Sequence, residues 1–285
     1  MRFLIANCYK ADGREEAIAA GVTPPEDLFR RVLETMLPNG FMSDVVYAAD
    51  PKAELPHNSS LSDYDGLIWS GSSLTIYHDV PEVRRQIEFA REVYKAGLPS
   101  YGSCWGLQVA ATAADGTCRQ NPRGLEVGLA RSVQLTSEGR GHPMFAGKPA
   151  VFDCPAIHYD EVELLPASAP LLASNRMSQV QAAAMEHEGT PFWAVQYHPE
   201  YDLKELASIM RFRARGLIGH GYGADEAAIH AVADDWETLH VDPSRKDIAW
   251  KYGIDLAMLE PAIRFQEIRN FVRYIATPRA ALRTG

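Results

Sequence analysis

Short apolar runs alternate with helical patterns along the first third of the chain. The apolar runs occupy residues 3–8, 45–47, 66–69 and 98–101. Segments 24–36 and 81–97 carry apolar side chains at the spacing of a helix with one buried face. Short strands separated by helices favour βαβ units. We therefore predict an α/β fold, with a doubly wound, mostly parallel central sheet and helices on both of its faces.

The pattern changes twice further along the chain. From residue 128 to 197 the apolar runs are short and separated by turns, which predicts partly antiparallel strands. These runs are 130–135, 151–154, 162–165, 171–174, 180–185 and 192–197. After residue 200 the pattern is helical to the end. We expect an α/β domain over 1–219 and a helical C-terminal extension over 220–285, which is acid-rich at 225–247 and basic at 264–285.

The composition is that of a globular protein with an acidic charge balance. The chain has 285 residues, of which 46% are hydrophobic and 23% are charged. Its 28 Lys and Arg residues against 37 Asp and Glu residues give a net charge of −9. A negative chain repels nucleic acid and anionic membranes. No apolar run approaches the ~18 residues that a membrane helix needs. We therefore expect neither nucleic acid nor a membrane as a partner.

The cysteines indicate a reducing compartment. The four of them, at positions 8, 104, 118 and 154, are widely scattered and form no C-x-x-C pair. The first residues carry one charge and an apolar run too short for a secretory signal. We therefore expect a cytoplasmic protein without a disulfide framework. Cys154 and His158 have the spacing of half a metal site, but no second half is visible, so we expect no metal.

One segment has the spacing of a nucleophile elbow. Gly102-Ser103-Cys104-Trp105-Gly106 lies between an apolar run and a small-residue helical segment. A residue on so sharp a turn is strained, and its neighbours at −2 and +2 must be small. A helix N-terminus favours the thiolate, and the Trp105 backbone N–H would point at a developing oxyanion. These features predict that Cys104 is a nucleophile.

A second motif supplies a base for that nucleophile. His198-Pro199-Glu200 ends a predicted strand. The proline holds the segment extended, so the histidine and glutamate side chains face the same side. We expect Cys104 to attack, His198 to act as general base and then acid, and Glu200 to orient the imidazole.

Together these motifs resemble the class I (triad) glutamine amidotransferases. The pattern G-x-C-x-G-x-Q over 102–108, followed by H-P-E, is most similar to the amidotransferase portion of GMP synthetase and its stand-alone relatives. Three further stretches fit the family: Asp65–Ser72, Leu125–Gly128, and Ile157–Val162 with Leu165-Pro166. The resemblance extends from residue 1 to about 219.

The resemblance implies roles for five more residues. Gly71 and Trp105 would form the oxyanion hole through their backbone N–H groups. Gln108 would help to hold the amino-acid end of the substrate, and the main chain around His158 and Tyr159 would close the pocket. The family chemistry needs no metal and no organic cofactor.

The sequence departs from the family pattern at two places. The glycine turn of the family is often Gly-Gly-Pro, whereas this chain has Ser70-Gly71-Ser72-Ser73. An insertion-like polar stretch, Lys10–Glu26, follows the first strand. Such a stretch can act as a lid that narrows or redirects the entrance.

Three functions remain open at this point. In the first, Cys104 attacks the γ-carboxamide of glutamine, and hydrolysis of the γ-glutamyl thioester releases ammonia for a biosynthetic acceptor. Residues 220–285 are too few for an ATP-using acceptor domain, so the acceptor would sit on a separate synthetase subunit. In the second, the chain is a stand-alone γ-glutamyl hydrolase or peptidase that cleaves a γ-glutamyl conjugate. The third is a non-enzymatic thiol sensor or binding protein. The charge order of the C-terminal extension is also compatible with a homodimer.

Overall fold

The apolar runs assemble into one nine-stranded sheet in the computed structural model, which describes residues 1–277. The strands of this sheet are β1 (Arg2–Asn7), β2 (Met42–Tyr47), β3 (Gly66–Trp69), β4 (Ser100–Ser103), β6 (Glu126–Leu135), β7 (Val151–His158), β9 (Leu171–Ser174), β10 (Ala182–His187) and β11 (Thr190–Val195). Their order is β2-β1-β3-β4-β11-β10-β9-β6-β7. A separate antiparallel pair is formed by β5 (Thr117–Gln120) and β8 (Asp160–Leu164).

The sheet has a parallel half and an antiparallel half. From β2 through β1, β3 and β4 to β11, every neighbouring pair is parallel. The pairs from β11 onward to β7 are antiparallel. The carboxyl ends of parallel strands open at one edge of the sheet, so the loops that follow β1, β3, β4 and β11 gather there. The predicted doubly wound α/β sheet is confirmed.

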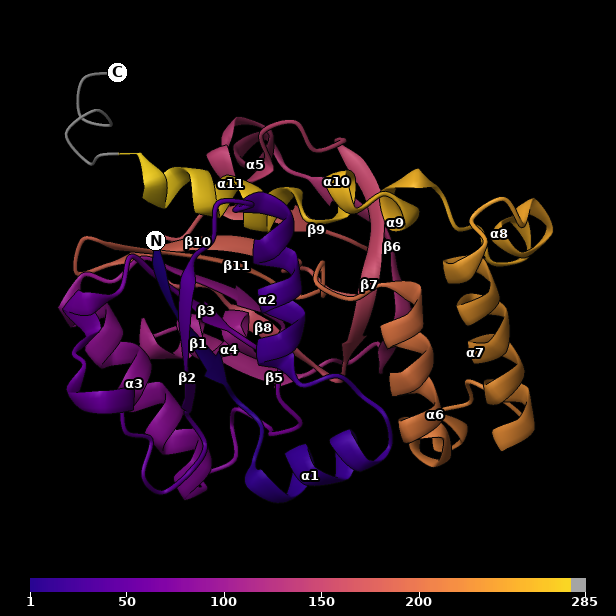
Figure 1. Ribbon diagram of the computed structural model, residues 1–285, viewed down its shortest axis with the longest axis horizontal. Coiled ribbons are helices and arrows are strands. Elements are labelled where there is room, and N and C mark those ends of the chain that lie inside the picture. Colours follow the sequence, from indigo (N-terminus) through magenta and orange to yellow (C-terminus); the bar gives the residue numbers. More distant parts are fainter. Residues whose placement is uncertain (278–285) are drawn as a thin grey trace.

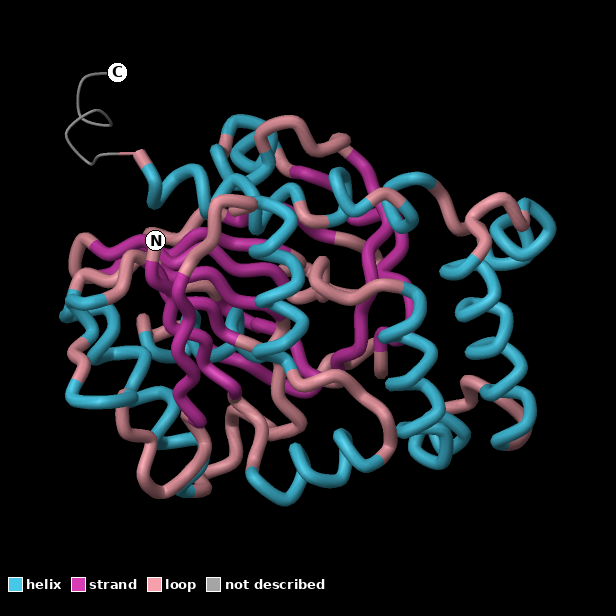
Figure 2. Tube along the Cα trace, viewed as in Figure 1, coloured by secondary structure: helices cyan, strands magenta, loops and turns pink. Residues whose placement is uncertain are grey.

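Helices cover both faces of the sheet, as Figure 2 shows. The helices are α1 (Ala11–Ala19), α2 (Pro25–Met36), α3 (Pro81–Ala96), α4 (Trp105–Ala113), α5 (Ser137–Gly141), α6 (Leu203–Gly219), α7 (Glu226–Val241), α8 (Lys246–Tyr252), α9 (Leu256–Leu259), α10 (Pro261–Arg264) and α11 (Gln266–Ala276). In Figure 1, α1 lies below the carboxyl ends of the first strands, and α6, α7 and α8 stand at the right.

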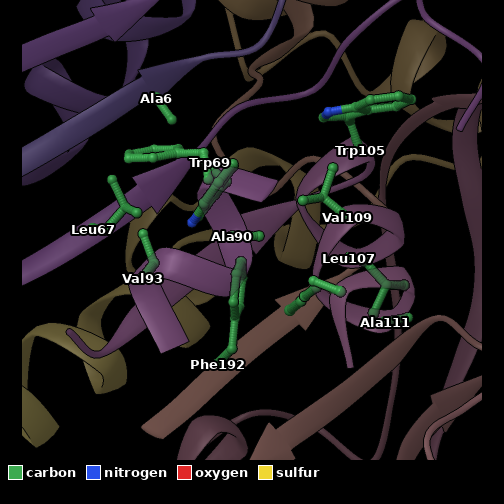
Figure 3. Packing of buried hydrophobic residues seen from close by; sticks show 14 of the residues in the cluster. Ala6, Leu67, Trp69, Ala90, Val93, Trp105, Leu107, Val109, Ala111 and Phe192 are labelled. Atoms are coloured by element: carbon green, nitrogen blue, oxygen red, sulfur yellow. The ribbon is translucent and has the colours of Figure 1, made fainter. Parts of the chain in front are cut away.

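One face of the sheet packs against α3 and α4. Successive residues of a strand point to opposite faces, and in β3 the side chains of Leu67 and Trp69 point to this face. They belong to one apolar cluster with Ala90 and Val93 of α3 and with Leu107, Val109 and Ala111 of α4 (Figure 3). The small residues of α4 let this helix lie close to the strands, which fixes its N-terminus at the sheet edge.

The opposite face packs against α2 and α11. Ile68, between the two β3 residues above, belongs to a cluster with Phe29 of α2 and Phe271 of α11. A side chain on Gly66 would lie 2.8 Å from Ile275 Cδ1, so this glycine allows α11 to approach the sheet. The C-terminal helix therefore returns across the domain, as Figure 1 shows.

The C-terminal extension is helical, as predicted. Its first long helix, α7, packs on α6 through a third apolar cluster that includes Ile229, Ala233 and Trp236. The division of the chain at residues 219 and 220 stays a prediction. The end of the basic segment, residues 278–285, lies outside the described residues. Within 1–277, no helix is long and apolar enough to cross a membrane.

Two elements differ from the expectations. The insertion Lys10–Glu26 contains α1, a helix with no buried side chain. Its sequence therefore has no apolar stripe from which a helix could be predicted. Strand β5 is short and has no fully buried residue, so its alternation was too weak to be recognised. Residues of this insertion line the cavity described below, and its action as a lid stays a prediction.

A buried ion pair ties α11 to the sheet domain. Lys148 Nζ lies 3.0 Å from Glu267 Oε2, and both side chains are fully buried. The ammonium also donates to the Ile263 carbonyl at 2.9 Å. The Tyr197 hydroxyl donates to Glu267 Oε1 at 2.5 Å. Glu267 therefore connects α11 to the residue that directly precedes His198.

We expect Lys148→Met to destabilise the protein strongly. The substitution leaves the Glu267 carboxylate buried without its cation, and breaking a buried pair in this way costs about 3–5 kcal/mol. Urea denaturation monitored by circular dichroism measures the free energy of unfolding. Replacing both partners, as in Lys148→Met with Glu267→Leu, should recover much of the loss. Arg215→Met is the control, because the Arg215 side chain is 92% exposed in its pair with Glu226. Equal stability of the single and double variants would contradict this account.

Candidate active site

Cys104 occupies the sharp turn between β4 and α4. Its backbone has φ 54° and ψ −98°, a positive-φ conformation that is strained for a residue with a side chain. A side chain on Gly102 would lie 2.9 Å from the backbone of Gly106, and one on Gly106 would lie 2.9 Å from Trp69 Cβ. Both flanking glycines are therefore required by close approach. The Cys104 N–H donates to the Val195 carbonyl at 2.7 Å, which joins the turn to the end of β11.

The imidazole of His198 lies beyond the end of β11 and is held on several sides. Its Nδ1 donates to Glu200 Oε1 at 2.6 Å. The second carboxylate oxygen, Oε2, accepts the Ser103 hydroxyl at 2.9 Å. The ring of Tyr201 stacks on the imidazole, with centroids 4.1 Å apart and an interplanar angle of 6°. The structure thus brings the predicted histidine and glutamate together. The hydrogen bond to Glu200 and the stacking of Tyr201 both fix the orientation of the imidazole ring.

The surroundings of His198 favour its charged form. Burial by itself lowers the pKa of the imidazole, but the Glu200 carboxylate and the neighbouring Cys104 thiol outweigh it and raise the pKa to about 10. The thiol lies beside this imidazole and 3.8 Å from the Ile157 carbonyl oxygen. The charged form of the His198 imidazole is therefore favoured directly beside the Cys104 sulfur.

Two backbone N–H groups near the thiol lack acceptors. Among the hydrogen bonds of residues 1–277, none uses the N–H of Gly71 or of Trp105. A side chain on Gly71 would lie 2.8 Å from His198 Cε1, so the glycine turn passes directly beside the imidazole. The serines that replace the usual family residues hold this turn, because Ser70 Oγ accepts the Cys8 N–H and Ser72 Oγ donates to the Cys8 carbonyl.

The predicted substrate-binding residues all border the same cavity, which has a volume of about 240 Å³. Gln108, on α4, points its amide toward the Asp160 carbonyl at 3.4 Å. Both ring nitrogens of His158 are occupied, by Glu126 Oε2 at 2.8 Å and the Asp160 carbonyl at 3.0 Å. His158 is therefore a wall of the cavity and not an available base. Tyr159 is half-exposed and packs edge-on against His220.

Several residues of the cavity were missed by the sequence reasoning. Tyr9 follows β1, and its hydroxyl lies near Gly71. Burial raises the pKa of this hydroxyl to about 12, so it remains a neutral donor. Tyr201 and Arg213 also border the cavity. The position of Tyr9 at the carboxyl end of a parallel strand was an available signal. The stacking of Tyr201 depends on tertiary geometry, so no signal in the sequence could have predicted it.

The site has no arrangement for a metal ion. Within residues 1–277, no group of three or more His, Cys, Asp or Glu side chains could hold one. Cys154, the other half of the spacing considered above, is buried, and His158 is engaged with Glu126.

The comparison with protein families identifies the chain. Residues 27–214, from within α2 to within α6, match the family model of glutamine amidotransferase class-I. The chain belongs to the class I glutamine amidotransferases.

Individual relatives and solved structures agree with this family. The chain is 34% identical to a γ-glutamyl-L-1-hydroxyisopropylamide hydrolase from a Pseudomonas species, over 85% of this chain and 82% of that protein. It is 31% identical to one of the subunits of the glutamine-hydrolysing GMP synthase from Methanocaldococcus jannaschii, over 56% of this chain and 76% of that protein. A glutamine amidotransferase structure from Thermotoga maritima aligns with a TM-score of 0.61 at 16% identity, covering 98% and 99% of the two chains. The last comparison bears on the fold alone.

We expect Glu200→Gln to lower the pKa of His198. The carboxylate favours the imidazolium, so its removal lets the ring lose its proton at a lower pH than about 10. A titration of ¹³Cε1-labelled histidine by NMR, with His198 assigned from a His198→Gln variant, measures the shift. Ser103→Ala is the matched control, because it removes a hydrogen bond to the same carboxylate and leaves its charge. A titration unchanged in Glu200→Gln, or shifted equally in both variants, would contradict the proposed pairing.

Proposed function

We propose that the protein is a stand-alone hydrolase that cleaves the γ-amide bond of a γ-glutamyl conjugate with Cys104 as its nucleophile. The observation that carries this proposal is the cavity that begins at the Cys104 thiol beside the His198–Glu200 pair and continues beneath α1. Ammonia, the leaving group of glutamine, needs no such room. The relative from Pseudomonas, named as a hydrolase of a γ-glutamyl amide, supports the same choice.

The first half-reaction is acylation. The Cys104 thiolate attacks the γ-carbonyl carbon, a C–S bond forms, and the carbonyl oxygen becomes an oxyanion facing the free N–H groups of Gly71 and Trp105. As the intermediate collapses, the C–N bond breaks and the His198 imidazolium gives its proton to the departing nitrogen. The amine leaves, and the γ-glutamyl group remains on sulfur as a thioester.

The second half-reaction is hydrolysis of the thioester. His198, now neutral, takes a proton from water, whose oxygen attacks the same carbon. The C–S bond breaks, glutamate leaves, and the thiolate and imidazolium are restored. Glu200 orients the ring through Nδ1, which leaves Nε2 for the proton transfers. Gln108 and residues 157–160 line the cavity and would hold the amino-acid half of the substrate.

A second candidate is a glutaminase that serves a separate synthetase. The likeness to the protein from Methanocaldococcus jannaschii favours it, since that protein is named as one subunit of a GMP synthase. In this case activity would be low in the chain alone and would rise with a partner. The third candidate is a thiol sensor. A sensor does not require an oriented general base, whereas a buried imidazole–carboxylate pair adjoins this thiol.

We expect Cys104→Ala to abolish glutamate release. The nucleophile and its thioester are lost, and loss of a nucleophile that acts as part of a triad reduces kcat by about 10⁶-fold. Glutamate release from L-glutamine and from γ-glutamyl alkylamides by the purified chain measures the activity. Cys118→Ala is the control, because that thiol contacts Thr112 and lies outside the cavity. Equal turnover in wild type and Cys104→Ala would refute the nucleophile. Faster cleavage of glutamine than of every alkylamide would favour the synthetase-linked glutaminase.

We expect Gly71→Ala to reduce kcat without unfolding the protein. The added methyl group would lie 2.8 Å from His198 Cε1, so the imidazole or the oxyanion turn must shift. Loss of one oxyanion donor reduces kcat by about 10²–10³-fold. Steady-state kinetics and the thermal midpoint are measured together. Gly219→Ala is the control, since nothing lies within 4 Å of the added atom. Full activity in Gly71→Ala would show that this turn takes no part in the mechanism.

A further inference from the structure

We propose, on the basis of the hydrolase function above, that the space between α1 and α6 is the binding site for the leaving amine. Its apolar walls select an amine with a short, uncharged hydrocarbon substituent over ammonia. The walls are contributed by Ile18 and Val22 on one side and by Ile209 and Phe212 on the other.

The direction of proton transfer decides which part of the cavity receives the amine. His198 must reach the departing nitrogen, so the leaving group lies on the side of the thiol that faces the imidazole. The thiol itself borders the Ile157 carbonyl, and Gln108 contacts the Asp160 carbonyl in the same wall. The γ-glutamyl half therefore lies against this wall, and the amine extends past His198.

Helix α6 leads away from the imidazole along the cavity. Tyr201, just before α6, stacks on His198, and the cavity-lining residues on α6 itself are Glu205, Ile209, Phe212 and Arg213. Within α6 the first three follow one another at spacings of three to four residues, which places them on one face of the helix. A substituent on the leaving nitrogen that extends away from His198 would therefore run along this face.

The insertion between β1 and α2 forms the opposite wall. No residue of α1 is buried, and Ile18 is 54% exposed although it borders the cavity. An exposed isoleucine by itself is ordinary. Here it lines the same cavity as Ile209 and Phe212, so an apolar group bound in that cavity would remove water from these side chains.

The wall formed by α1 is anchored at two points. Arg14 donates to the Tyr9 carbonyl at 2.7 Å and pairs with Asp50 at 2.8 Å. The Thr23 N–H donates to Glu205 Oε1 at 3.0 Å, which ties the end of the insertion to α6. The two walls are therefore held at a fixed separation before any ligand binds, which lowers the entropic cost of binding.

The charged groups of the cavity leave one competing interpretation. Arg14 is paired with Asp50, Glu205 accepts the Thr23 N–H, and Glu26 accepts the Asn7 amide at 2.7 Å. Arg213 has no salt bridge within residues 1–277, and its guanidinium lies 5.0 Å from the ring centroid of Phe212. It is only half-buried and stays hydrated. An amine carrying a carboxylate would be its natural ligand, and the experiment includes one.

The test varies the leaving amine and keeps the γ-glutamyl half constant. The substrates are L-glutamine, the γ-glutamyl methyl-, ethyl- and propylamides, and γ-glutamylglycine, with kcat/KM measured by glutamate release from the full chain. Burial of each added methylene is expected to raise the ratio of kcat/KM for the alkylamide to kcat/KM for glutamine about fourfold. Ile18→Ser and Phe212→Ser should each reduce that ratio about tenfold, the effect of losing between one and two such contacts. Val241→Ser, at a side chain that is 81% exposed on α7, is the matched control and should leave the ratio unchanged.

The outcomes separate this inference from the proposed function. If no γ-glutamyl compound is cleaved, the hydrolase function itself fails. If the compounds are cleaved but the ratio is the same in wild type, Ile18→Ser and Phe212→Ser, the function stands and the leaving-amine site is refuted. If γ-glutamylglycine is preferred over the alkylamides and Arg213→Met removes that preference, the site binds an anionic amine and the proposed selectivity is refuted. Thermal midpoints of all variants exclude unfolding as the cause.

Discussion

The turn between β4 and α4 has no room for a side chain at Gly102 or Gly106, and this close contact determines where the rest of the site lies. Gly102 touches Gly106 within the turn, and Gly106 touches Trp69 of the neighbouring strand. Cys104 between them keeps a positive φ, a conformation that costs about 1–3 kcal/mol and persists only where its surroundings enforce it. The enforcement comes from the glycine contacts and from the hydrogen bond to Val195. The thiol is thereby held at the N-terminus of α4, beside the end of β11.

The parallel half of the sheet then brings distant residues to this thiol. Strand β4 lies between β3 and β11, and all three run in the same direction. The segments after their carboxyl ends contribute Gly71, Cys104 and His198 respectively. In the proposed mechanism these supply the oxyanion donor, the nucleophile and the base. An antiparallel arrangement would send the three segments to opposite edges of the sheet, so the chemistry depends on the strand direction as much as on the residues.

The sequence was most informative where a constraint is local. The G-x-C-x-G spacing predicted the elbow because the steric requirement lies within five residues, and H-P-E predicted the imidazole–carboxylate contact because its two partners are two residues apart. The parallel strands were predicted from their apolar runs. Contacts between distant segments gave no such signal. The stacking of Tyr201 on His198, the path of α11 across the sheet and the Lys148–Glu267 pair depend on how whole elements dock. Helix α1 escaped recognition because it buries no side chain and therefore has no apolar stripe.

Helix α6 connects the chemistry to the proposed selectivity. It begins directly after the segment that carries His198, Glu200 and Tyr201, and its first turn is capped by the Asp202 side chain, which accepts the Glu205 N–H. The same Glu205 receives the Thr23 N–H from the insertion. On its other side α6 is packed by α7 through Leu206, Met210 and Trp236. A displacement of α6 would move Tyr201 against the imidazole and Phe212 along the cavity at the same time. The C-terminal extension, which supports α6 from outside, therefore stabilises both the base and the wall that the leaving amine is proposed to meet.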